Sequence, residues 1–101
     1  MTKKEITMGE KNALRSATEY LENQNFSFRG LVEQLEYEGY THDEAVFGVS
    51  NVDVDWNEQA AGSAKSYLES SAFSRTGLKE QLIYEGFSEE QAEYGVTQAG
   101  Y

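Results

Sequence analysis

The sequence predicts an all-α fold made of two tandem three-helix units, each of which contains a helix-turn-helix. Three observations support this fold class. The chain repeats itself with an offset of 47 residues, it contains no proline, and its apolar residues recur at helical spacing. With 101 residues, the chain has room for one compact domain or for two very small ones that share a core.

The internal repeat aligns residues 16–54 with residues 63–101 without a gap. We therefore expect a flexible N-terminal spacer over residues 1–10, a first repeat over 11–54 and a second over 55–101. Three aligned pairs differ in character and are expected on outward faces: Val32/Lys79, Glu36/Ile83 and Val46/Glu93. Most identical pairs fall at apolar, glycine and capping positions, and they include Ala17/Ala64, Leu31/Leu78, Leu35/Leu82, Gly48/Gly95 and Val49/Val96.

The first helix of each unit is clearest in the second repeat. The segment from Asp55 to Glu58 has the spacing of a capping box, in which each side chain binds the backbone N–H of the other residue. Trp56 and the alanines that follow it then lie on one face of a helix that runs to about Ser70. In the first repeat Gly9 stands opposite Trp56, so we expect this helix to be less well anchored and to fray over residues 1–9.

The second helices begin and end at recognisable signals. Ser27 and Ser74 are N-cap residues, each preceded by a phenylalanine in the position of a hydrophobic staple. Gly39 and Gly86 can adopt the positive φ that closes a helix C-terminus. We therefore expect two short helices that end in tight glycine turns.

The third helices begin with the capping boxes 41–44 and 88–91. Each carries a glycine near its middle, Gly48 or Gly95, where glycine costs about 0.5–1 kcal/mol relative to alanine. Because the cost occurs in both repeats, we interpret these glycines as sites of close approach between helices.

Charge narrows the range of functions. The formal net charge is −10, and residues 32–64 contain no Lys or Arg. A recognition helix needs basic side chains for phosphate contacts, and both third helices lack them, so duplex DNA and other nucleic acids are excluded as expected partners. The excess of acid either keeps a small domain soluble or attracts a basic partner.

A candidate contact surface follows from this charge. Tyr37 and Tyr84 precede the glycine turns beside acidic residues, and they either contribute to this surface or wedge the turns against the third helices. The residues we assign to binding a partner are Glu33, Glu36, Asp43, Glu44, Asp53, Glu58, Tyr37 and Tyr84.

No arrangement of residues indicates an enzyme, a metal site or a cofactor. Asp53, Asp55 and Asn57 match the start of a calcium loop, but Glu58 replaces the required glycine and Ala64 the required glutamate, so Asp55 is better explained as a helix cap. His42, the only histidine, has no ligand or nucleophile beside it, and the chain has no cysteine. No apolar run approaches the roughly 20 residues that a membrane span needs.

The repeated strings Phe26-Ser27, Gly30-Leu31, Gln34-Leu35, Tyr37-Glu38-Gly39 and Phe47-Gly48-Val49, with Asp55-Trp56-Asn57-Glu58-Gln59-Ala60 between the copies, carry a family resemblance. From about Ala13 to Tyr101 the chain resembles the Ltp-type host cell surface-exposed lipoproteins. The resemblance implies tandem helix-turn-helix units used away from nucleic acid and a prophage-encoded role in superinfection exclusion. It also implies a lipidated cysteine that tethers the protein to the outer face of a Gram-positive cytoplasmic membrane. Since no cysteine is present, we expect the chain to be a soluble fragment of such a lipoprotein, with residues 1–10 as the end of its spacer.

Two functional hypotheses follow from the sequence and the resemblance. In the first, the acidic surface binds a basic segment of an incoming phage protein, for which the tape measure protein is the leading candidate, and DNA entry is blocked without chemistry. In the second, the chain is a non-enzymatic host-surface adaptor that binds a cell-wall or membrane component.

Overall fold

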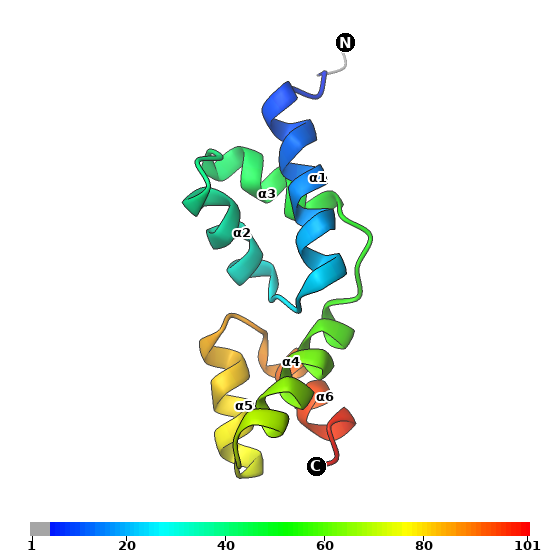
Figure 1. The fold of residues 1–101 in the computed structure, drawn as a ribbon, viewed down its shortest axis with the longest axis vertical. Coiled ribbons are helices and arrows are strands. Elements are labelled where there is room, and N and C mark those ends of the chain that lie inside the picture. Colours follow the sequence, from blue (N-terminus) through cyan, green and yellow to red (C-terminus); the bar gives the residue numbers. More distant parts are fainter. Residues whose placement is uncertain (1–4) are drawn as a thin grey trace.

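In the computed structural model, which describes residues 5–101, the chain forms six α-helices, and no strand occurs in that range (Figure 1). The predicted all-α class and the tandem arrangement of two three-helix units are confirmed. The two units stack along the long axis of a molecule that measures 51 × 27 × 20 Å. The helices are α1 (Met8–Asn23), α2 (Phe28–Tyr37), α3 (His42–Asn51), α4 (Trp56–Ser70), α5 (Arg75–Tyr84) and α6 (Glu89–Gln98).

The start of α1 corrects two predictions. The helix begins at Met8, where the sequence suggested a spacer to residue 10 and fraying to residue 9. Thr7 and Glu10 form a reciprocal capping box, with Glu10 N to Thr7 Oγ1 at 3.1 Å and Thr7 N to Glu10 Oε1 at 2.9 Å. This box supplies the anchor that Gly9 was expected to lack. The predicted spacer residues 1–4 lie outside the described residues.

The other predicted caps are present with one exception. Ser27 and Ser74 each accept a hydrogen bond from the backbone N–H three residues later, and α3 and α6 begin with reciprocal capping boxes. Asp55 accepts from Asn57 N and Glu58 N, which confirms it as the cap of α4. The Glu58 carboxylate does not return the bond, because it accepts a hydrogen bond from the hydroxyl of Tyr94 instead.

Each unit has its own apolar core. One buried cluster is formed by residues of α1, α2 and α3, and the other by residues of α4, α5 and α6 together with Phe87. Leu31 and Leu35 in the first unit, and Leu78 and Leu82 in the second, are fully buried. Identical residues at matched positions therefore build the same core twice.

The outward orientation predicted for two divergent positions is wrong. Val32 is 6% exposed and belongs to the first core, and Val46 packs against it. Their equivalents in the second unit, Lys79 and Glu93, form an ion pair with 3.1 Å between Nζ and Oε2. The same position thus carries an apolar contact in one unit and an ion pair in the other.

Close approach between the first and third helices of each unit explains the central glycines. A Cβ placed on Gly48 would lie 2.6 Å from the carbonyl carbon of Ala13, and one on Gly95 would lie 2.9 Å from that of Ala60. Both obstacles are backbone atoms, which cannot rotate away as a flexible side chain could. The two glycines therefore permit a separation between helices that no other residue would allow.

The two units meet end to end, with the C-terminus of α5 against the N-terminus of α2 (Figure 1). Ser27 Oγ donates to the carbonyl oxygen of Glu85 at 2.6 Å, and Arg29 Nη2 donates to that of Tyr84, also at 2.6 Å. These bonds satisfy carbonyl groups that the end of a helix leaves without partners, and they place a cation at the negative end of the helix dipole. Gly86, with φ +111°, closes the turn, and a Cβ on it would lie 2.7 Å from Ser27 Oγ.

A second contact between the units involves Trp56, the only tryptophan. Its ring meets that of Phe28 edge to face, with 5.5 Å between centroids. Beside it, the backbone N–H of Phe26 donates to Gln59 Oε1 at 2.9 Å. Trp56 therefore begins the second unit but packs against the core of the first.

We expect Gly48→Ala to lower the free energy of unfolding by about 1–3 kcal/mol, because the clash with the Ala13 backbone outweighs the gain in helix propensity. Urea denaturation measures this difference. Ser50→Ala, at an exposed position of the same helix, serves as the control and should change stability little. Equal stability of Gly48→Ala and wild type would contradict the interpretation.

We expect Phe28→Ala to destabilise the chain by about 2 kcal/mol and to shift the emission of Trp56 to longer wavelength, because it opens the contact between the units. Phe73→Ala is the matched control, since Phe73 contacts Tyr67 edge to face within the second unit. It should lower stability and leave the tryptophan emission unchanged. Unaltered emission in Phe28→Ala would show that Trp56 does not report on this contact.

Candidate functional site

The first part of the predicted acidic surface lies at the outer end of α2 and the start of α3. Glu33, Glu36 and Tyr37 lie on the exposed face of α2, and Asp43 is exposed in the first turn of α3. The Glu36 carboxylate lies 3.3 Å from Nδ1 of His42. Three carboxylates and a tyrosine are thus available to a partner in this part of the first unit.

Two other predicted residues already serve the fold. The Glu44 carboxylate accepts from Thr41 N at 2.9 Å and occupies the space that a Cβ on Gly9 would need. The Glu58 carboxylate is bound by Tyr94. The sequence assigned both to partner binding, although it also predicted the capping box that engages Glu44. It could not show the bond to Glu58, since Tyr94 lies 36 residues away.

A second acidic group lies along the connection between the units. Asp53 and Glu58 line one shallow groove, and Asp55 and Glu22 line it as well. Glu22 was missed, because it lies at the end of α1 and reaches the groove only through the folding of the chain. The structure thus places the predicted acidic residues in two groups on different elements.

Both predicted tyrosines are exposed. The exposed fraction is 88% for Tyr37 and 78% for Tyr84, so the alternative in which they wedge the turns is wrong. Only the backbone carbonyl of Tyr84 takes part in the contact between the units. The two rings are therefore accessible contact area.

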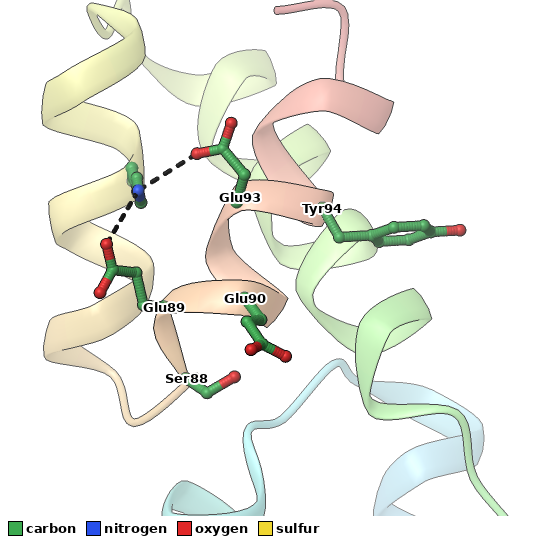
Figure 2. Close-up of a pocket in the computed structure, with 6 residues that line it drawn as sticks. Ser88, Glu89, Glu90, Glu93 and Tyr94 are labelled. Carbon is green, nitrogen blue, oxygen red and sulfur yellow. Dashed lines mark ion pairs between the residues drawn. The ribbon is translucent and has the colours of Figure 1, made fainter.

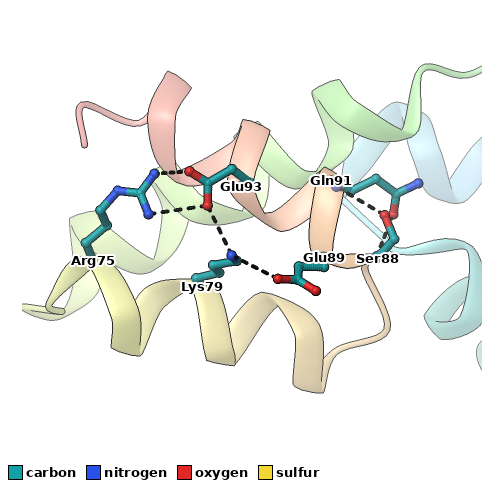
Figure 3. Close-up of polar contacts among 6 residues, drawn as sticks. All are labelled: Arg75, Lys79, Ser88, Glu89, Gln91 and Glu93. Atoms are coloured by element: carbon teal, nitrogen blue, oxygen red, sulfur yellow. Dashed lines mark hydrogen bonds and ion pairs between the residues drawn. The ribbon is translucent and has the colours of Figure 1, made fainter.

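Two basic side chains of the second unit form ion pairs with carboxylates of the same unit. Arg75 and Lys79 on α5 both bind the carboxylate of Glu93 on α6, and Lys79 Nζ also lies 3.5 Å from Glu89 Oε1 (Figure 3). Figure 2 shows Glu89 and Glu93 in a surface pocket that Glu90 and Tyr94 also line, and Lys79 belongs to the same lining. Hydrogen bonds from Arg75 and then Lys79 lower the pKa of Glu93 to about 2. Arg75 and Lys79 are thus already paired with carboxylates of their own unit.

The comparisons with known proteins agree with this architecture. The family model described as host cell surface-exposed lipoprotein matches residues 9–52 and again residues 55–98, one match for each three-helix unit. This chain belongs to that family. No curated protein matches it. Among solved structures, it is similar to Ltp, a superinfection exclusion protein from the Streptococcus thermophilus temperate phage TP-J34. That similarity has a TM-score of 0.85 and 27% sequence identity, and it covers 92% of this chain and 97% of the other.

The described part of this family member has no cluster typical of metal binding and no helix typical of a membrane span. Over residues 5–101, no three His, Cys, Asp or Glu side chains lie together so as to hold a metal ion. Within the same range, no helix is long and apolar enough to cross a membrane. What the described surface does present is exposed carboxylates and tyrosines.

The ion pairs of Glu93 should make stability depend on pH. A carboxyl group with a lowered pKa stabilises the fold above its ordinary value near 4.5, and this contribution is lost as the pH falls toward 2. We expect Glu93→Gln to be less stable than wild type at pH 6, by a small amount because the pair is half-exposed, and the gap should close by pH 2. Urea denaturation across this range, with Glu80→Gln at an exposed position of α5 as control, measures the gap. A difference that does not change with pH would contradict the assignment.

Proposed function

We propose that this chain acts in superinfection exclusion: displayed at the surface of the host cell, it binds a component of an incoming phage and blocks DNA entry without chemistry. One observation carries the proposal, namely the similarity over 92% of the chain to a phage superinfection exclusion protein within the same family. The repeat and its end-to-end joint are features of a rigid binding module, and the exposed carboxylates supply its contact chemistry.

The charge supports a basic partner. The net charge of −10 and the exposed Glu33, Glu36 and Asp43 favour encounter with a positively charged segment. The tape measure protein is our candidate, since it travels in the path of DNA injection and must pass the cell surface. For the full-length form we propose a lipidated cysteine as the anchor and the outer face of a Gram-positive cytoplasmic membrane as the location.

The proposal predicts where infection stops. The domain would be joined to a lipoprotein leader with its lipid-acceptor cysteine and expressed in a phage-sensitive Gram-positive host, and adsorbed phage and internalised phage DNA would be counted separately. We expect normal adsorption and blocked DNA entry for at least one phage. Normal entry for every phage tested would remove the proposal and favour the host-surface adaptor.

Binding through acidic side chains of the first unit can be tested with two matched sets of charge-removing substitutions. Glu33→Gln, Glu36→Gln and Asp43→Asn together remove three charges from the first unit, and Glu69→Gln, Glu80→Gln and Glu90→Gln remove three exposed charges from the second. We expect the first set to weaken exclusion and the second to preserve it.

Binding of the isolated phage partner should fall by about tenfold between 50 mM and 150 mM salt, because exposed charges are screened over that range. Affinity that is indifferent to salt would refute the acidic mechanism.

A further inference from the structure

The joint between the units shows how the C-terminus of α5 is bound by residues of the first unit. The carbonyl oxygens of Tyr84 and Glu85 accept hydrogen bonds from Arg29 and Ser27, which lie at the start of another helix. Gly86 is part of this surface, because its missing side chain leaves room for Ser27 Oγ at 2.7 Å and Arg29 Cβ at 2.9 Å from the position of a Cβ. The binding motif is thus a tyrosine, a glutamate and a glycine at a helix C-terminus.

The first unit carries the same motif, and it is open. Tyr37, Glu38 and Gly39 end α2 as Tyr84, Glu85 and Gly86 end α5, and Gly39 has φ +103° where Gly86 has +111°. A Cβ on Gly39 would meet no atom within 4 Å. Among residues 5–101, no side chain donates to the carbonyl oxygens of Tyr37 or Glu38.

The surroundings of the two motifs also match. Gln34 Nε2 lies 3.3 Å from both Tyr20 Oη and Glu38 Oε2, and Gln81 makes the equivalent bonds to Tyr67 and Glu85 at 3.2 and 3.4 Å. A groove runs beside each network. In the second unit its lining includes Asn25, which the first unit contributes, whereas in the first unit every lining residue belongs to that unit: Ser16, Glu19, Tyr20, Asn23, Gln24 and Glu38.

Charge identifies the kind of group that would dock there. The end of α2 is the negative end of a helix dipole, and exposed carboxylates lie on this helix, from Glu33 and Glu36, and at its C-cap, from Glu38. At the occupied end the donor that enters is an arginine, which can bond a carbonyl oxygen and remain charged. The open end therefore suits a cationic helix start.

A second copy of the chain is a poor occupant. The helix start that a second copy would offer is that of α5, which carries Thr76 in place of Arg29 and Arg75 in place of Phe28. Arg75 is already bound by Glu93. Gly9 stands where the joint has Trp56. Two chains of charge −10 would also repel each other.

We propose that the open end of α2, formed by Tyr37, Glu38 and Gly39, binds the N-terminal turn of a basic helix in the partner protein, with an arginine of that turn on the Tyr37 carbonyl. The site deepens the proposed function and rests on it for the identity of the partner. Its geometry rests only on the equivalence with the joint inside this chain.

The first experiment compares Gly39→Ala with Gly100→Ala in the membrane-anchored chain. Both glycines have positive φ, +103° and +118°, and at both a Cβ would meet no atom within 4 Å, so the backbone strain is matched. Circular dichroism first establishes that both variants are folded. We expect Gly39→Ala to raise phage DNA entry at least tenfold over wild type, because its Cβ lies where the partner's arginine must approach, and Gly100→Ala to block entry normally. Exclusion preserved in both variants overturns the site and leaves the proposed function standing.

The second experiment needs no phage. The probe is a peptide of residues 23–37, which contains Ser27 and Arg29, with Val32→Lys joined to Glu36 by a lactam so that its helix is formed and verified before use. Added at millimolar concentration to the ¹⁵N-labelled chain, it should shift the amide signals of residues 37–40, and Gly39→Ala or an Arg29→Ala peptide should abolish the shifts. No shift, or equal shifts with the alanine peptide, overturns the site even if wild type excludes phage. Concentration-dependent shifts of residues 37–40 and 74–76 without peptide would identify a second copy as the occupant and overturn the basic partner.

Discussion

The close approach of the first and third helices is the constraint on which the rest of the structure depends. At Gly48 and Gly95 the facing backbone lies nearer than any Cβ would permit, so each pair of helices is locked at one separation. The second helix then packs on the pair by burying two leucines, and its end is fixed in space. Because both units share this construction, the end of α5 and the start of α2 can meet in the one geometry that the joint requires.

The two units have diverged where their neighbours differ. In the first unit Phe28, Val32 and Val46 are apolar, and Trp56 of the second unit packs against Phe28. In the second unit the equivalent positions are Arg75, Lys79 and Glu93, and both cations pair with the Glu93 carboxylate. The same three positions thus carry apolar contacts in the first unit and ion pairs in the second.

The sequence predicts what depends on neighbours along the chain. Helix starts at Ser27, Thr41 and Ser88 follow from side chains that bond the backbone three residues later, and the repeat itself gives the number of units. The sequence does not predict contacts between residues that lie far apart along the chain. Glu58 has the spacing of a capping residue but is bound by Tyr94, and Val32 was judged outward because its partner in the alignment is a lysine. The acidic character of the candidate site follows from composition, whereas its division into two groups follows from folding.

The distribution of charge now has a structural reason. In the second unit α5 contacts α6 through ion pairs, because Arg75 and Lys79 both bind the Glu93 carboxylate. The first unit makes the equivalent contact with apolar side chains and therefore needs no cations there, so its acidic residues from Glu33 onward remain uncompensated. Each unit has three Lys or Arg against eight Asp or Glu, so the units differ in where the cations lie and not in net charge. The last cation of the first unit is Arg29, so the end of α2, which is also open, has acidic side chains and no Lys or Arg. A basic helix that approaches the chain would meet both features at once, which is why we assign recognition to the first unit and structural closure to the second.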